Sequence, residues 1–409
     1  MIDADESKAV LNDGKIAVHS LRRAFAELLV SLGANPDEPQ EVSRRFGLDK
    51  TLTWRIARAV AEEDPWESLQ HLPSRPGIRI FASAMSKHGA SADRIEMLWK
   101  AQETFERFIE THSGDRETLE MMVSVNATKS AEKRMEAFRR DGYQANSALL
   151  GVRAQARVSA AIMAPSSTPG MAEISAVSGL VGFCRLRPNV PWAVATQKDW
   201  DKDSGLLKPE ALRSDPLDPT VSADDAPLLT QFCSQPMPVI RMYREAGGVV
   251  HYMLAEGTVG YTAAATVFSG WRRRQPVPLH ESYAGECGEH GVNLTTPTEM
   301  LVFDLMVHRS IRFPSDPTVR VYSQFPGGPQ IPQFDSDAGL LPVPTGLIDL
   351  GVGNIESPIP EFPRYHEMIA FALGRLGFAP SDFHVYRYRL RYPPMPALVV
   401  IRHPLLPRA

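Results

Sequence analysis

The sequence predicts an all-α N-terminal part followed by an α+β part in which the strands are mainly antiparallel. Five of the 34 prolines lie in residues 1–164, and the other 29 lie in residues 165–409. Because proline is excluded from helix interiors and central strands, the first part can form long helices, whereas the second must consist of short elements and many turns. Apolar residues at steps of three and four in the first part, and short Val-, Tyr- and Thr-rich segments in the second, support the same division.

Composition excludes several classes of protein. The chain has 409 residues, of which 43% are hydrophobic and 22% charged, as is typical of a globular protein. No apolar run approaches the ~20 residues that a membrane span needs, and the N-terminus lacks the features of a signal peptide. We therefore expect a cytoplasmic protein with no membrane partner.

Charge and cysteine content limit the possible sites. The net charge is −4, so no global basic field draws the chain to nucleic acid, and any such contact must be local. The three cysteines are far apart and odd in number, which predicts neither a disulfide framework nor a paired-cysteine zinc site. We expect no metal and no cofactor.

The helical part is predicted to contain a series of amphipathic segments. An apolar stripe runs through the first of them, and Gly33 follows it as a candidate C-cap. The sequence Asp141-Gly142 separates the last two, and the last is rich in small residues that suit close packing. In chain order, helices are expected over residues 16–32, 40–61 (two pieces divided at Gly47), 92–109, 116–123, 129–140 and 145–163.

The second part is predicted to consist mainly of strands. Helices are expected over 297–310, where Thr296 to Glu299 has the form of a capping box, and over 365–376, which Gly377 ends. Residues 198–238, rich in proline and aspartate, indicate a long irregular excursion. Strands are expected over residues 248–255, 258–268, 318–325, 384–392 and 397–402, with a hairpin turn at Glu256-Gly257 between the first two.

These elements suggest three domains. Residues 1–70 are predicted to form a three-helix head, and residues 71–164 a helical connector that is a candidate for dimerisation. Residues 165–409 are predicted to form an α+β sensor or assembly domain, with the excursion near 198–238 inserted in it.

Residues 40–61 carry the strongest motif of the sequence. Ser43 is small where two helices would approach, Gly47 supplies a turn, and Asp49 can cap the second helix. The positions expected to be buried are Val42, Phe46, Leu48, Leu52, Ile56 and Val60. Together with the preceding helix, about residues 16–62, this segment resembles the helix-turn-helix of bacterial transcription regulators. The sequence departs from that pattern at Thr53, where the family usually buries Val or Ile, and at Asp49, where Ser or Thr is more usual.

The resemblance implies a set of DNA-binding residues. Those implied to point into the major groove are Lys50, Thr51 and Trp54. Those implied to lie near phosphates are Arg44, Arg45, Arg55 and Arg58. Trp54 is large for its position. The alternative is that three amphipathic helices simply pack together, with the arginines forming a solvated basic face.

A second, speculative ligand-binding site lies in the α+β part. Its residues are His280, Glu286, Cys287 and His290. A cysteine with a histidine three residues later could bind a metal or form a nucleophile–base pair, but no further ligand follows at a suitable spacing. The alternative is a polar, glycine-rich loop.

The strand expected over 384–392 alternates strictly. Arg387, Arg389 and Arg391 share one face, and like charges at this spacing repel one another unless negative charges compensate them. An anionic ligand or a second subunit could do so, as could acidic side chains of the chain. Alternatively, this is an edge strand that its charges protect from aggregation.

The leading functional hypothesis is a sequence-specific DNA-binding transcriptional regulator with a C-terminal effector-sensing or oligomerisation domain. Its partners would be double-stranded DNA, a second copy of the chain and a small-molecule or anionic effector. The chain lacks the P-loop, nucleophile-elbow and zinc-protease motifs, so no enzyme chemistry is required. The alternative is a ligand-binding protein or enzyme with its site around residues 280–290, in which the N-terminal helices serve only for assembly. A purely structural assembly protein is a third possibility.

Overall fold

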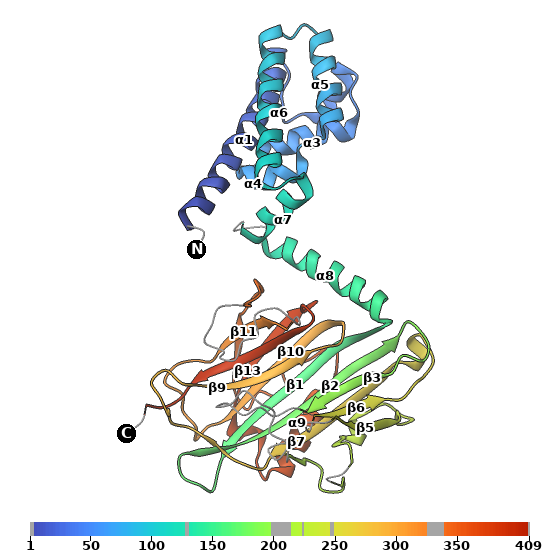
Figure 1. Ribbon diagram of the computed structural model, residues 1–409, viewed down its shortest axis with the longest axis vertical. Coiled ribbons are helices and arrows are strands. Elements are labelled where there is room, and N and C mark those ends of the chain that lie inside the picture. The colour runs from blue at the N-terminus through green and yellow to red at the C-terminus, as the bar shows by residue number, and fades with distance from the viewer. Residues whose placement is uncertain are drawn as a thin grey trace. The chain divides into compact units, whose positions relative to one another are not determined.

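The computed structural model describes residues 4–126, 131–197, 214–222, 225–245, 249–324 and 339–407 (Figure 1). The chain divides into two compact units, residues 1–135 and 136–409, which we call the helical unit and the sheet unit. The predicted order of the fold, helices followed by a mostly antiparallel, strand-rich region, is confirmed. The division at Met135 and Glu136 falls within the segment predicted to be a connector.

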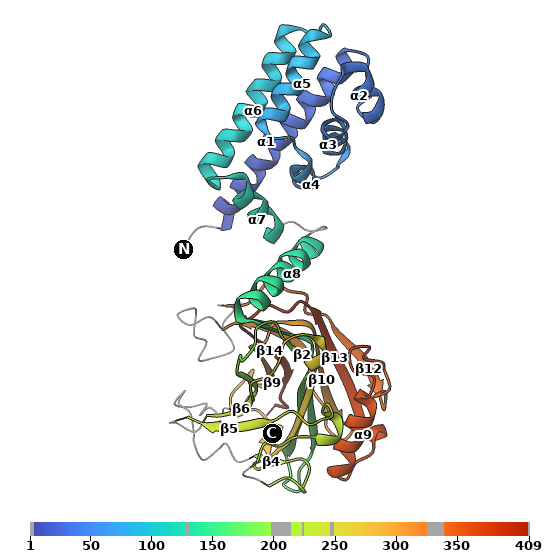
Figure 2. The same cartoon turned by 90° about the vertical axis from the view of Figure 1, so that its right-hand side faces the viewer.

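The helical unit is built around one apolar core. The long helices α1 and α6 lie side by side, and α2, α3 and α5 complete the core with residues such as Phe46, Ile56 and Phe81 (Figure 2). The helices are α1 (Ala4–Ser31), α2 (Pro39–Phe46), α3 (Lys50–Ala61), α4 (Pro65–Ser68), α5 (Arg75–Lys87), α6 (Ala92–His112) and α7 (Arg116–Asn126), with a 3₁₀ turn, η1 (Leu69–His71). A further helix, α8 (Ala131–Leu150), spans the division between the units.

The described part of the sheet unit contains one large sheet and two small ones. The large sheet has the order β12-β13-β10-β1-β2-β7-β4, with β8 paired to β2, and β1 and β10 are its parallel pair. Its strands are β1 (Val152–Pro165), β2 (Met171–Arg185), β4 (Ser214–Pro216), β7 (Ala265–Arg273), β8 (Val277–Pro278), β10 (Thr298–His308), β12 (Leu347–Val352) and β13 (Phe383–Arg391).

The small sheets cover one face of the large sheet. One has the order β11-β14-β9 and the other β3-β6-β5. Their strands are β3 (Trp192–Gln197), β5 (Ile240–Arg244), β6 (Val250–Leu254), β9 (Cys287–Leu294), β11 (Thr318–Ser323) and β14 (Ala397–Pro404). The opposite face packs against α9 (Tyr365–Arg375), as Figure 2 shows. The remaining elements are the 3₁₀ turns η2 (Thr230–Phe232), η3 (Tyr261–Ala263) and η4 (Pro380–Asp382).

Two predicted helices are wrong. The helix expected over 145–163 is instead the end of α8, a turn at Gly151 with φ +72°, and strand β1. The helix expected over 297–310 is strand β10, which lies between β1 and β13 and is buried on both faces. A strand buried on both faces loses the alternation of apolar and polar residues by which strands are recognised.

Other boundaries also differ from the prediction. The break expected at Asp141-Gly142 is absent, because α8 runs through it, and α1 begins at Ala4 rather than at residue 16. No hairpin forms at Glu256-Gly257: β6 pairs with β3 and β5, whereas β7 pairs with β2 and β4. Helix α5 was not predicted.

Several predicted elements are confirmed. Two helical pieces flank Gly47, and the helices predicted over 92–109, 116–123 and 365–376 correspond to α6, α7 and α9. The strands predicted over 384–392 and 397–402 correspond to β13 and β14. The described part of 198–238 is mostly irregular, but residues 198–213 and 223–224 lie outside the described ranges, as does Phe325 at the end of another predicted strand. None of the helices in the described ranges combines the length and apolarity needed to cross a bilayer.

Candidate nucleic-acid interface

The turn between α2 and α3 is short and fixed by hydrogen bonds. Gly47 adopts a left-handed conformation with φ 64°, which glycine reaches without the steric cost of a Cβ atom. Ser43 is buried, and its hydroxyl donates to the carbonyl oxygen of Leu48 at 2.7 Å. Leu48 is buried as well. The roles predicted for these residues, a small contact, a turn and an apolar plug, are confirmed.

Asp49 caps α3 as predicted. Its Oδ1 atom accepts hydrogen bonds from the backbone N–H groups of Thr51 at 2.8 Å and Leu52 at 3.2 Å. Hydrogen bonds from Leu52 and Thr51 hold the pKa of the carboxyl group below its usual value, because they stabilise the charged form. The Asp49 carboxylate therefore serves the helix terminus, where the helix dipole also favours a negative charge.

Helix α3 has a clearly divided surface. Thr53, Ile56, Ala57 and Ala59 are buried against the rest of the helical unit. Leu52 and Val60, expected to be buried, are half-buried. Since a helix turns once every 3.6 residues, the exposed positions fall on the opposite face. On α3 itself, the exposed residues predicted to bind DNA are Lys50, Thr51, Trp54 and Arg58.

Two of the predicted DNA-binding arginines have internal partners. Arg55 is half-buried, and its Nη2 donates to the carbonyl oxygen of Leu72 at 2.9 Å. Arg45 is exposed, but its two Nη atoms donate to the carbonyl oxygens of Leu32 at 2.5 Å and Gly33 at 2.8 Å. These bonds satisfy carbonyl groups that a helix end or a turn leaves unpaired. Arg45 and Arg55 thus hold α2 and α3 against neighbouring segments.

The other basic residues of this surface remain available. Arg44, Lys50 and Arg58 are exposed, and in the described part of the chain none of them forms an ion pair with a carboxylate. The Nε atom of Arg44 donates to the carbonyl oxygen of Gln40 within its own helix at 3.3 Å. Unpaired surface cations are the groups that phosphate contacts use.

Trp54 is the large apolar group on this face, with 47% of its surface exposed. The His71 ring meets it edge to face at a centroid distance of 5.8 Å, and the Arg58 guanidinium lies over it at 5.5 Å. Burial lowers the pKa of His71; the charge of Glu62, 4.0 Å away, opposes this shift, and the charges of Arg58 and Arg55 support it. We call Lys50, Thr51, Trp54 and Arg58 the α3 face.

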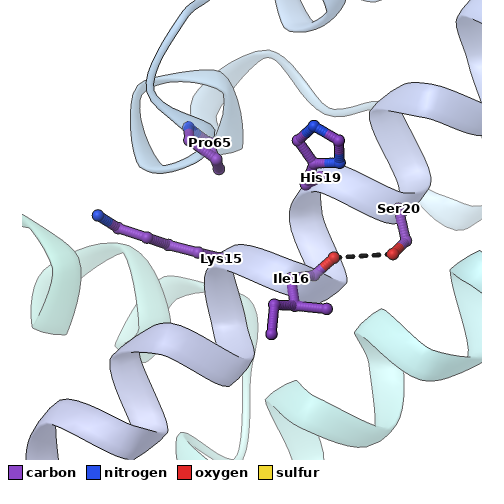
Figure 3. A pocket seen from close by; sticks show the side chains of 5 residues that line it. All are labelled: Lys15, Ile16, His19, Ser20 and Pro65. Atoms are coloured by element: carbon purple, nitrogen blue, oxygen red, sulfur yellow. Dashed lines mark hydrogen bonds between the residues drawn. The ribbon is translucent and has the colours of Figure 1, made fainter.

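A small hollow of about 260 Å³ lies elsewhere in the helical unit, between α1 and the start of α4 (Figure 3). Lys15, Ile16, His19, Ser20 and Pro65 line it. The Ser20 hydroxyl donates to the carbonyl oxygen of Ile16 at 2.8 Å and so serves α1 itself. The remaining polar groups, Lys15 and His19, are exposed and do not form a set of converging donors and acceptors. We assign no binding role to this hollow.

The cluster predicted around residues 280–290 is dispersed. Cys287 and His290 are three residues apart on strand β9, so their side chains lie on opposite faces of it. Glu286 is buried and accepts a hydrogen bond from the backbone N–H of Ser282 at 2.7 Å. The His280 ring lies beside Gly170, at the turn between β1 and β2. The structure therefore does not bring a nucleophile–base pair together here.

His290 is instead part of a buried group that the sequence did not reveal. Its Nε2 lies 3.2 Å from the Sδ of Met163, and its ring stacks on that of His403 at 5.5 Å. Burial lowers the pKa of His290 to about 3 and that of His403 to about 4. Both imidazoles are neutral core groups at pH 7. Within the described ranges, no group of three or more His, Cys, Asp and Glu side chains is arranged to hold a metal ion.

The arginines of β13 form ion pairs with carboxylates of the same chain. Arg387 is 2% exposed and forms a bidentate pair with Asp304, with both nitrogen–oxygen distances 2.8 Å. Arg389 pairs with Glu361 at 2.8 Å and Arg391 with Glu136 at 3.4 Å. The edge-strand alternative is wrong, because β13 lies between β10 and β12.

Comparisons with known proteins do not identify a family for this chain. No protein-family model, curated protein or solved structure matches this chain.

Proposed function

We propose that the chain is a sequence-specific DNA-binding regulator whose α3 face enters the major groove. The observation that carries this proposal is the composition of that face: two cations that form no ion pair with the described carboxylates, a threonine and an exposed tryptophan, with the carboxylate of Asp49 engaged as a helix cap and that of Glu62 4.0 Å from His71. A solvated basic face alone would not require an exposed tryptophan.

The chemistry of the α3 face suits a base edge and its phosphates. Lys50 and Arg58 can bond to phosphate oxygens or to guanine O6 and N7, and the methyl group of Thr51 can contact a thymine methyl. Trp54 supplies a flat apolar surface whose orientation is held by His71 and Arg58. Arg44, at the end of α2, lies where the first helix of such a motif crosses the DNA backbone.

Arg45 and Arg55 play a different part in this proposal from the one that the resemblance implies. Their guanidinium groups hold backbone carbonyls of neighbouring segments, so they fix the angle of α2 and α3 before DNA binds. Preorganising a binding surface reduces the entropy lost on binding. We therefore assign positioning roles to both.

The sheet unit then serves as an effector-sensing or oligomerisation domain in the cytoplasm. Bacterial regulators of this kind bind as dimers to two half-sites one helical turn apart, and a second copy of this chain would supply the second α3. Both the second copy and the effector are parts of the proposal.

Binding of the full chain to duplex DNA tests the proposal. Fluorescence anisotropy on a pool of labelled duplexes, followed by selection of bound sequences, gives both affinity and specificity. We expect K50A and R58A each to lower the slope of log affinity against log salt by about one, because each removes one phosphate contact. The matched control is R107A, which removes the same charge from an exposed site on α6.

The outcomes separate the hypotheses. A parent protein without salt-dependent binding to any duplex would contradict the proposal and favour an assembly role for the helical unit. Equal losses in R58A and R107A would indicate only a non-specific effect of net charge. A selected sequence that loses its preference in T51A or W54A would support base readout by the α3 face.

A further inference from the structure

Arg157, on the inner strand β1, has no carboxylate partner among the described residues. Its Nη1 donates to the carbonyl oxygen of Val194 at 3.1 Å. Its Nε is buried without an acceptor, and its Nη2 forms no hydrogen bond with the described residues. Burial lowers the pKa of Arg157 to about 10, and no acidic side chain opposes this shift.

Arg157 as a whole is half-buried, and only its Nε atom is fully buried without a partner. Three arginines of the sheet unit are more deeply buried, and each uses its donors more fully; Arg185 donates to the carbonyl oxygens of Val190, Leu254 and Ala255. Arg387 uses Nε and Nη2 together, the two donors on one edge of the guanidinium, to hold both oxygens of Asp304. Arg402 pairs with Glu289 at 3.0 Å. In Arg157 the same Nε–Nη2 edge is empty. An unpaired buried charge is costly, so its presence calls for a partner or a function.

The bond to Val194 explains only part of Arg157. Val194 lies at an irregularity in the pairing of β3 with β6, between Ala193 and Ala195. Its carbonyl therefore lacks a regular ladder partner, and Nη1 of Arg157 satisfies it. A single donor suffices for that purpose, which leaves the charge and the Nε–Nη2 edge unexplained.

A row of three serines adjoins Arg157 on the same face of the large sheet. Ser159 follows Arg157 by two residues on β1 and pairs in register with Ser178 of β2, which pairs with Ser269 of β7. The Ser159 hydroxyl donates to Oγ of Ser178 at 3.1 Å, and the Ser269 hydroxyl donates to the backbone oxygen of Ser178. The Ser159 hydroxyl also lies 3.3 Å from the carbonyl oxygen of Val177, its alternative acceptor, so the hydroxyl of Ser178 can donate either to Ser159 or to a ligand.

Only the middle serine of the row is partly accessible, because Ser159 and Ser269 are buried. Ser178 and, two residues before it, Ala176 are half-buried, although β2 is an inner strand flanked by β1 and β7. On one side of this row, Leu180 and Val267 lie under the β3-β6-β5 sheet. On the other side, residues such as Met163 lie under the β11-β14-β9 sheet. Among the described residues, this face is therefore partly open at Ala176 and Ser178, between the two small sheets.

We propose that the Nε–Nη2 edge of Arg157 and the hydroxyl of Ser178 bind a small oxyanion, a carboxylate or a phosphate group, on the face of the large sheet between the two small sheets. The two parallel N–H donors of a guanidinium edge match two oxygens of either group, and a neutral hydroxyl adds a third donor. A flanking wall of apolar residues excludes water from the ion pair and strengthens it. This site belongs to the sheet unit, and its occupancy can be measured without DNA.

Thermal unfolding of the full chain tests the proposal. Sodium phosphate and sodium acetate are titrated separately against sodium chloride of equal ionic strength. We expect a saturable rise in Tm with at least one of the two oxyanions, since a ligand of the native state alone stabilises it by mass action. A response to phosphate alone assigns a phosphate ligand, and a response to acetate assigns a carboxylate.

Three variants identify the site. R157M should weaken the response at least about tenfold, because it removes the donors, and S178A should weaken it by a smaller factor while keeping Arg157 and the fold. The control R312M removes the same charge from an exposed position and should respond like the parent. A parent without any response beyond chloride would overturn the proposal, and so would an unchanged response in R157M. If R157M does not fold, R157K replaces it. An unchanged oxyanion response in both S178A and R157K, measured as separate variants, would then overturn the proposal.

Discussion

Asp304 is a buried carboxylate whose oxygens are fully used by two side chains. Arg387 holds both of them, and the hydroxyl of Tyr365 donates to Oδ2 at 2.5 Å. Burial raises the pKa of Tyr365 well above its usual value, and the charge of Asp304 acts in the same direction. The remaining Nη1 of Arg387 donates to the carbonyl oxygen of Ser357. This group joins β10, β13 and α9.

Removing one member of the Asp304–Arg387 pair should strongly destabilise the sheet unit. R387M leaves a buried carboxylate without its cation, for which we expect a loss of about 3–5 kcal/mol. Denaturant unfolding followed by circular dichroism measures this loss. The double variant D304L/R387M should lose less than the sum of the two single variants, because neither charge is then left unpaired. Strict additivity would show that the pair contributes no coupling.

The cap at Asp49 makes a second prediction about a single residue. Its folded pKa is lowered, so the stabilisation is present above the unfolded value of about 3.9 and is lost as the pH falls through the folded value. We expect D49A to unfold at a lower temperature than the parent at pH 7, with a difference that shrinks toward pH 3. D49N, which keeps an oxygen acceptor, should stay close to the parent at pH 7 and show no such titration. A pH-independent difference for D49A would contradict the assignment.

The residues that sequence reasoning placed correctly act over short distances. Ser43, Gly47 and Asp49 do their work within six residues of chain, so spacing alone reveals it. Arg45 and Arg55 reach carbonyls 12 to 17 residues away, and nothing in their local sequence indicates this. The environment of Arg157 could not be predicted for another reason, since the sequence of its segment predicts a helix.

At the level of elements, the sequences of two strands have features that are typical of helices. Strand β10 begins within a Thr-x-x-Glu sequence, Thr296 to Glu299, that is typical of a helix start, and its apolar run has no alternation because both faces are buried. Strand β1 is rich in alanine, which favours a helix, yet lies at the centre of the large sheet between β10 and β2. Tertiary packing overrode local propensity in both segments, and with them the strand order could not be predicted.

Helix α8 is continuous where the sequence predicts a break, and this difference leads to a prediction. Gly142 was expected to break it, but the helix is continuous there, and a Cβ atom added to Gly142 would meet nothing within 4 Å. G142A should therefore stabilise the protein by about 0.5–1 kcal/mol, since alanine gains helix propensity at no steric cost. Thermal unfolding measures the change.

The control for Gly142 lies at the end of the same helix. Gly151 has φ +72°, and a Cβ atom there would lie 2.4 Å from Nε of Arg187. G151A should destabilise by about 1–2 kcal/mol, because an L side chain is strained in this region. If G142A also proved destabilising, the continuity of α8 through residue 142 would be in doubt.

The whole molecule consists of two units with separate cores. The core of the helical unit is formed by residues between Val10 and Val123, and the three cores of the sheet unit by residues between Leu150 and Ile401. The proline distribution predicted this change of architecture in outline. It placed the change near residue 165, whereas the first strand begins at Val152, because prolines mark turns and not the central strands that precede them.

Separate cores imply separate unfolding transitions. We expect differential scanning calorimetry of the full chain to deviate from a two-state transition. F81A, which removes a fully buried ring from the helical core, should cost about 3–5 kcal/mol and lower one transition only. R387M should lower only the other, because its partners all lie in the sheet unit. A single transition that both variants shift equally would show instead that the two units unfold as one cooperative body.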